Sequence, residues 1–230
     1  MMFTQIVDLA KTSVRELNHR LHDLGAEHDG ERWRVLNPRG AHAIACGLRA
    51  PLTVEIEGHA GYYCAGMNQR ATVIVHGNVA TGLAENMMSG IVHVYGNASQ
   101  CAGATAHGGL LIVEGDASAR CGISMKGINI VVKGSAGHMS AFMAQAGNLV
   151  ICGDAGDALG DSIYEARLFV RGKVASLGTD CIEKEMRGEH LALLGTLLKR
   201  AGFDTRPEEF RRYGSARKLY HFKIDHASLY

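Results

Sequence analysis

Three aspartates that lie close together in the sequence are the first candidates for chemistry: Asp154, Asp157 and Asp161. Clustered carboxylates can bind calcium, or they can serve as the acid and base of a glycosidase. Asp154 directly follows a glycine, however, and a Gly-Asp pair is common in turns without any catalytic reason. We therefore expect a structural role for these aspartates.

The cysteines and histidines do not have the spacing of a metal site. Neither an iron–sulfur cluster nor a zinc site fits cysteines that include no C-x-x-C pair. The chain also lacks a G-x-S-x-G motif, a P-loop and a dinucleotide-binding glycine motif. We therefore expect no catalytic residue, no metal and no cofactor on this chain, and free thiols at its six cysteines: Cys46, Cys64, Cys101, Cys121, Cys152 and Cys181.

Composition narrows the class of protein further. The 230 residues carry a formal net charge of +1, so nothing favours binding to nucleic acid or to an anionic membrane surface. The N-terminus lacks the pattern of a signal peptide and no stretch of 18 apolar residues occurs, so we expect a cytoplasmic protein. The unusual feature is glycine, with 29 residues against 3 prolines.

Seven of these glycines recur every 19 residues, which is the signature of a repeat architecture. An aliphatic residue stands four positions and two positions before each of them, as in a short strand of period two. Asn, Asp or Ser usually follows, which is typical of a turn. We interpret the seven as structural turn glycines: Gly58, Gly77, Gly96, Gly115, Gly134, Gly153 and Gly172.

A 19-residue unit is too short for a helical repeat and cannot bury a core alone. We therefore predict an all-β fold: a single-stranded, right-handed parallel β-helix of about seven coils, whose equivalent residues stack in ladders. We assign residues 52–181 to the β-helix, 1–51 to an N-terminal helical cap with a lead-in strand, and 182–230 to a C-terminal helical and extended tail.

One column of the repeat bears on partners. The residue three positions before each glycine should point outward, yet five of the seven are apolar. Such a stripe is unfavourable in water, so either the flanks of this chain cover it or another protein does. The candidate interface residues are Ile74, Ile112, Val131, Val150 and Phe169.

The flanks carry helix signals. Ser13 and Glu16 form a capping box that predicts a helix over residues 13–24. Asp180 with Glu183 resembles a second helix start, which Gly188 interrupts. A further leucine-rich segment is predicted to end at Gly202, and a proline at 207 opens a short helical turn. We expect these segments to cap the solenoid.

The coils over residues 53–181 resemble the β-helical C-terminal domain of the large subunit of glutamate synthase, and also the β-helical subunit of formylmethanofuran dehydrogenase. Residues 209–220, with 185–190 before them, are similar to stand-alone small subunits of the glutamate synthase type, as in the separate β-helical subunit of N-methylglutamate synthase. This resemblance covers nearly the whole chain.

The resemblance implies a subunit of a multi-subunit enzyme that converts methylamine and glutamate to N-methylglutamate and ammonia. One partner would be like a class II glutamine amidotransferase, and the other would be an FMN-binding, glutamate-synthase-like subunit with an iron–sulfur cluster. The β-helix would organise these partners and line part of an amine or ammonia passage. The family places its catalytic residues on the other subunits.

Two alternatives stay open at this point. The chain is the equivalent subunit of another redox complex, such as one like formylmethanofuran dehydrogenase, or it is a free-standing carbohydrate-active β-helix enzyme. The first alternative predicts a molybdenum- or tungsten-containing partner. The second needs a carboxylate such as Asp157 to be essential for polysaccharide turnover.

Overall fold

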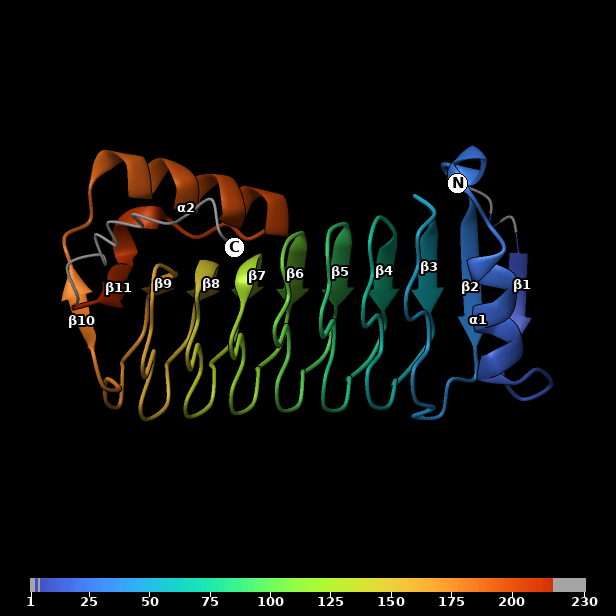
Figure 1. Cartoon of the computed structure of the whole chain (residues 1–230), viewed down its shortest axis with the longest axis horizontal. Helices are drawn as coiled ribbons and strands as arrows, with labels where there is room; N and C mark the ends of the chain where they lie inside the picture. The colour runs from blue at the N-terminus through green and yellow to red at the C-terminus, as the bar shows by residue number, and fades with distance from the viewer. Residues whose placement is uncertain (1–2, 4, 217–230) are drawn as a thin grey trace, which may run out of the picture.

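The computed structural model describes residue 3 and residues 5–216. Its strands form one sheet with the order β1-β2-β3-β4-β5-β6-β7-β8-β9-β11-β10, stacked along the long axis of the molecule (Figure 1). The repeating strands share one direction and one register, and they are β3 (Thr53–Ile56), β4 (Thr72–Val75), β5 (Ile91–Val94), β6 (Leu110–Val113), β7 (Lys126–Val132), β8 (Ala146–Ile151) and β9 (Arg167–Val170).

The two aliphatic residues of each strand point into the solenoid, as their period-two spacing predicts. Val73 of β4, for example, pairs with Val92 of β5, and both are fully buried. A second ladder of small residues, such as Ala98 paired with Ala117, follows each strand and closes the coil. The prediction of a parallel β-helix of about seven coils is therefore confirmed.

The repeated glycines lie at the bends after the strands, but their role differs from the predicted one. Only Gly58 has a positive φ, so unusual dihedral angles do not explain the other six. They are required by close stacking: a Cβ atom on Gly77 would lie 2.6 Å from the carbonyl carbon of Gly58, and one on Gly134 would lie 2.7 Å from the carbonyl oxygen of Gly115. Each bend leaves no room for a side chain because the preceding coil occupies that space.

The residue after each glycine links neighbouring coils. The backbone N–H of Asn97 donates to Oδ1 of Asn78 at 2.9 Å, and Asp116 donates in the same way to Asn97 at 2.8 Å. The pattern continues through Ser135 and Asp154. These side chains therefore cap the backbone of the next coil, rather than their own turn as sequence reasoning supposed.

Left-handed backbone occurs instead on the return segment of each coil. Ala65, Ala84 and Ala141 have φ between 54° and 59°, and Gly103 and Gly122 take equivalent positions with φ of 68° and 70°. Small residues are favoured there because a left-handed conformation strains larger side chains, and because these positions are closely surrounded inside the coil.

The N-terminal segment both extends and caps the solenoid. Strands β1 (Gln5–Asp8) and β2 (Arg32–Leu36) continue the parallel sheet beyond β3. Helix α1 (Val14–His22) confirms the predicted helix, because its N-cap Ser13 accepts a hydrogen bond from the N–H of Glu16 and it buries Leu17 and Leu21. A short 3₁₀ turn, η1 (Ala26–His28), precedes β2.

The C-terminal segment differs from the prediction at its beginning. The residues expected to start a helix at Asp180 lead instead into strand β10 (Cys181–Lys184), which pairs antiparallel with β11 (Arg211–Ser215). Helix α2 (Gly188–Ala201) begins at the glycine that was expected to interrupt it, and it ends at Gly202 in a left-handed conformation, as predicted. Turn η2 (Pro207–Glu209) follows, and residues 217–220 of the family-like run lie outside the described residues.

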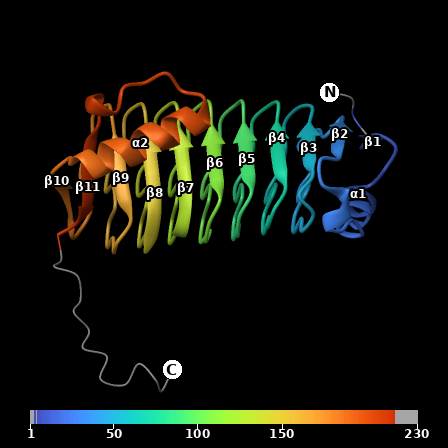
Figure 2. The same ribbon diagram turned by 90° about the horizontal axis from the view of Figure 1, so that it is seen from above.

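Helix α2 lies across the outer face of the sheet in its C-terminal half (Figure 2). Its Leu194, Leu197 and Leu198 belong to a buried cluster that includes four of the five outward apolar residues, Ile112, Val131, Val150 and Phe169. The interpretation of these four as an interface for another protein is therefore wrong, because the chain's own helix covers them. Ile74 is the exception and remains half-exposed.

In the part of the chain that the structure describes, neither α-helix is long and apolar enough to cross a membrane.

Candidate functional site

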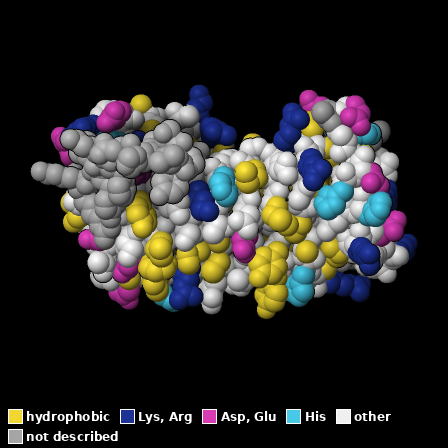
Figure 3. Space-filling view, viewed as in Figure 1, with side chains coloured by type: hydrophobic (Ala, Val, Ile, Leu, Met, Phe, Trp, Pro, Cys, Tyr) yellow, Lys and Arg dark blue, Asp and Glu magenta, His cyan; other side chains and the backbone are white. Residues whose placement is uncertain are grey.

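The outer face of the sheet is open over β3, β4 and β5, between the end of α2 and the N-terminal elements (Figure 1). In the space-filling view the upper outline of the molecule dips at this place, and histidine and hydrophobic side chains lie near the dip (Figure 3). We call this surface the saddle, and we define it by the outward side chains of these strands and of the residues just after them: Glu55, Glu57, Ile74, His76, Ile91, His93 and Tyr95.

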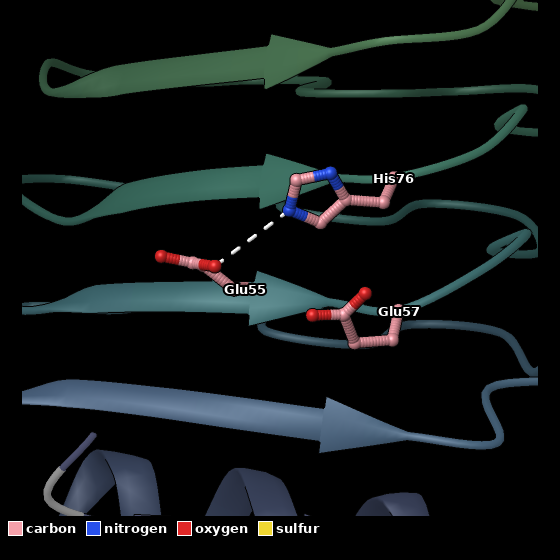
Figure 4. A group of neighbouring side chains, drawn as sticks. All are labelled: Glu55, Glu57 and His76. Atoms are coloured by element: carbon pink, nitrogen blue, oxygen red, sulfur yellow. Dashed lines mark ion pairs between the residues drawn. The ribbon is translucent and has the colours of Figure 1, made fainter. Parts of the chain in front are cut away.

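One end of the saddle is a cluster of charged side chains on neighbouring coils (Figure 4). Glu55 points outward from β3 but is only 7% exposed, because Arg32 of β2 forms an ion pair with it. The Nε2 atom of His76 lies 3.6 Å from Oε2 of Glu55. Arg34 pairs with Glu57, with 3.2 Å between Nε and Oε1.

Glu55, Glu57 and His76 could in principle hold a metal ion, since one ligand atom of each lies within 4.8 Å of the others. The charge balance of the cluster opposes this, because Arg32 and Arg34 already neutralise the two carboxylates. A cation would have to break both guanidinium contacts. The geometry therefore fits a compensated ion-pair network better than a metal centre.

A row of stacked rings crosses the middle of the saddle. Tyr95 stacks on His93 with 4.5 Å between ring centroids, and on His76 with 5.1 Å. Its side chain is 52% exposed. The saddle thus presents an aromatic side chain with one apolar face and one polar end, which is the type of residue enriched in protein interfaces.

The other end of the saddle is joined to the region under α2 by ion pairs. Glu114 accepts a hydrogen bond from Nζ of Lys133 at 2.9 Å, and its other carboxylate oxygen lies 3.0 Å from Nε2 of His93. Burial raises the pKa of Glu114, but these two hydrogen bonds outweigh it and hold the pKa below its usual value. The Lys133 ammonium also lies 5.3 Å from the ring centroid of Phe203, just beyond α2.

Between these polar ends the floor of the saddle is apolar. Ile74 and Ile91 are both half-exposed, and Ile91 packs at the edge of the cluster that α2 covers. The saddle therefore continues the apolar surface on which α2 lies, without a covering element among the described residues. An apolar strip bordered by charged pairs is the composition of a protein-binding surface.

The aspartates considered first do not converge on one site. Asp154 belongs to the ladder at the bends, where its Oδ1 accepts the N–H of Lys173 at 2.7 Å. Asp157 accepts a hydrogen bond from the hydroxyl of Ser176, and Asp161 one from the hydroxyl of Ser162. Each carboxylate thus has a local structural partner.

The six cysteines are free thiols in the structure, as expected. Burial raises the pKa of Cys121 to about 12 and, against the opposing effect of Arg171, that of Cys152 to about 11. Such thiols stay protonated at neutral pH and behave as small apolar side chains.

Sequence reasoning missed the saddle residues other than Ile74. A signal was present for His76 and Glu57, because these residues occupy the same coil position 19 residues apart, as do Tyr95 and Glu114. Four polar or aromatic residues in one outward column, next to a column that changes from polar to apolar, mark a surface with a different environment. What the sequence did not show is where α2 ends.

The fold and the saddle together define a class: a capped parallel β-helix that offers an open outer face for contact with another molecule. Comparison with known proteins is consistent with a distinct group of such proteins. The chain is 64% identical over 226 residues to Protein GlxC of Rhizobium meliloti (strain 1021), and the alignment covers 98% of this chain and 99% of that protein. The chain therefore belongs to the same family as Protein GlxC.

No family model matches the chain, and no solved structure matches it.

Proposed function

We propose that this chain is a non-catalytic β-helical scaffold subunit of a glutamate-synthase-like complex, most specifically N-methylglutamate synthase, in the cytoplasm. Its partners would be a class II glutamine amidotransferase-like subunit and an FMN-binding, glutamate-synthase-like subunit with an iron–sulfur cluster. The complex would convert methylamine and glutamate to N-methylglutamate and ammonia. The proposal combines the resemblance of the coils and of residues 209–220 with the surface that the structure leaves open.

The single observation that carries a scaffold role is the incomplete cover of the sheet's outer face. Over β6 to β9, α2 buries the outward apolar residues, whereas Ile74, Ile91 and Tyr95 over β3 to β5 remain half-exposed or exposed. Removing such side chains from water is the main driving force of protein association. The ion pairs at both ends of the saddle would fix the register of a partner.

Any amine or ammonia passage that this subunit helps to line would run along its outside. The inward aliphatic residues of successive coils, among them Val73, Val92, Leu111 and Ile130, are fully buried against one another. A core of this kind is packed as densely as an organic crystal. We therefore propose that the subunit contributes a wall of such a passage at its interface with a partner.

Purification of the affinity-tagged chain from its native host tests the proposal. We expect an amidotransferase-like protein and a yellow, FMN-containing protein to co-purify, with iron in the eluate. A molybdenum- or tungsten-containing partner would instead indicate the formylmethanofuran dehydrogenase-like alternative. Elution of the chain alone would refute the scaffold role.

A pair of variants places the partner on the saddle. Ile74→Asp puts a charge on the apolar floor and should abolish co-purification while the chain stays folded. Ile182→Asp is the matched control, because Ile182 is also an exposed isoleucine, at 42%, but lies on β10 at the far end of the solenoid. Equal capture by both variants would show that the partner binds elsewhere.

A further inference from the structure

The described chain ends close to the uncovered half of the sheet. The N–H of Ala216 donates to the carbonyl of Asp180 at 2.7 Å, directly after β11. Since β11 runs antiparallel to β9, it ends at the edge of the sheet where β3 to β9 begin (Figure 2). Residues 217–230 therefore start from the same edge of the sheet that borders the saddle.

The sequence of this last segment has the pattern of a one-sided apolar strand. Tyr220, Phe222 and Ile224 alternate with polar residues. In an extended conformation, side chains two positions apart lie on the same face, so these three would form one apolar face. A segment of this composition favours burial of that face against another apolar surface.

The length of the segment is sufficient to reach the saddle. From β11 to β4 there are six strand spacings in the sheet. At about 4.8 Å per spacing this distance is roughly 29 Å. Residues 217–230 span up to about 46 Å when extended, so they can pass alongside α2 and still lie across β5 and β4.

We propose that residues 217–230 occupy the saddle in the free subunit, with their apolar face on Ile74, Ile91 and Tyr95. The segment completes the cover that α2 begins, so that one continuous part of the chain, from α2 to the C-terminus, lies on the outer face of the sheet. This occupant is favoured over a second copy or a foreign chain because it is already tethered, and tethering replaces a bimolecular association with an intramolecular one of high effective concentration.

The proposal has a regulatory consequence that rests on the proposed function. If the partner subunit binds the saddle, residues 217–230 and the partner compete for the same side chains. The free subunit is then protected from non-specific association through Ile74 and Ile91, and the partner must displace the segment in order to bind.

Footprinting of the isolated chain with hydroxyl radicals and mass spectrometry tests the occupant. The full chain is compared with a chain that ends at Ala216. We expect labelling of Tyr95 to increase several-fold in the shortened chain. Tyr63 is the internal control, because it is equally exposed at 52% but lies on the return segment of the first coil, and its labelling should not change.

A second pair of variants keeps the length of the chain. Phe222→Glu with Ile224→Glu removes the apolar face and should expose Tyr95 as the truncation does. Lys223→Glu changes a residue of the opposite face and should leave Tyr95 protected. Equal labelling of Tyr95 in the full and shortened chains would overturn the proposal, as would protection that disappears only because an oligomer dissociates, which sedimentation would reveal.

These outcomes are separate from those of the proposed function. The footprint is measured without any partner, whereas the scaffold role is measured by co-purification. The shortened chain should capture the partner at least as well as the full chain. Loss of capture on truncation would show that residues 217–230 bind the partner directly, and it would overturn competition for the saddle.

Discussion

The two halves of the outer sheet face are built from the same coil but have different environments. Over β6 to β9, α2 covers an apolar column that contains Val131 and Phe169, both fully buried. Over β3 to β5, the same column contains Glu55, Ile74 and His93, and α2 does not reach it. The coil therefore fixes which residues point outward, and the chemistry of those residues decides what can cover them.

The difference teaches that the interior and the exterior of this solenoid follow separate rules. Inward residues are aliphatic in both halves because every coil must bury them. Outward residues vary along the axis, and the apolar ones coincide with the amphipathic helix that the chain itself supplies. The predictions below test how far the two halves share their interior and differ in their exterior.

The largest effect should come from the bend glycines, and it should be equal in the two halves. Gly77→Ala in the open half and Gly134→Ala in the covered half each place a Cβ within 2.7 Å of backbone atoms of the preceding coil. Backbone cannot move aside without shifting the stack, so each variant should lose about 3 kcal/mol or more of unfolding free energy. Chemical denaturation followed by circular dichroism measures this loss.

Gly188→Ala is the control for these variants, because a Cβ at this position meets no other atom within 4 Å. It should change stability by less than about 0.5 kcal/mol. A large loss at only one of the two bends would contradict the view that the coils are equivalent inside.

The next effect should separate the halves. Val131→Asp buries an unpaired carboxylate under α2 and should cost about 3–4 kcal/mol. Ile74→Asp, in the same column of the open half, should cost less than about 1 kcal/mol because the carboxylate reaches water. Thermal unfolding of the two variants under identical conditions gives the comparison, and equal losses would show that the saddle is covered as tightly as the face under α2.

A smaller effect, again shared by both halves, should come from the ladder at the bends. Asn78→Ala removes the acceptor for the N–H of Asn97, and Ser135→Ala removes the acceptor for the N–H of Asp154. Each should cost about 0.5–1 kcal/mol, since the freed N–H groups are near the surface. Asn78→Asp keeps an acceptor and should retain most of the stability in urea titrations; a loss as large as that of Asn78→Ala would argue against the ladder.

The smallest effect should appear where the two halves meet, at Glu114. Its pKa is lower in the folded protein, so its contribution is fully present above the ordinary carboxyl pKa of about 4.3 and is lost as pH falls through the folded value. Glu114→Gln should therefore reduce stability by less than about 1 kcal/mol at neutral pH. The difference from the unmodified protein should shrink as urea titrations are repeated at pH values progressively below about 4.3. A constant difference at every pH would rule out the ionised carboxylate as its source.

Much of the fold could be predicted because it repeats. Seven glycines in phase with aliphatic pairs determined the strands, their parallel stacking and the inward residues. The position of the bend glycines was also predicted, although the reason was wrong: the sequence shows that a glycine is needed, but not whether a dihedral angle or a neighbouring coil requires it.

The rest depended on contacts between distant segments. The segment from Cys181 to Lys184 became a strand because β11, almost 30 residues later, pairs with it, and tertiary pairing overrides local helix signals. The saddle could not be predicted because it is defined by the end of α2, which packs against strands more than 50 residues away in sequence. For the same reason, sequence alone left open what covers Val131 and Val150.

The ladder at the bends has a consequence for how proteins of this family can change in length. Each acceptor side chain serves the N–H group 19 residues later, and each bend glycine fits against the bend one coil earlier. Inserting or deleting a single residue within a coil would shift the glycine and its acceptor out of step with the neighbouring coil. Gain or loss of an entire coil restores every contact, so natural relatives with longer or shorter solenoids should differ in steps of one coil, and smaller insertions should fall in the flanking segments.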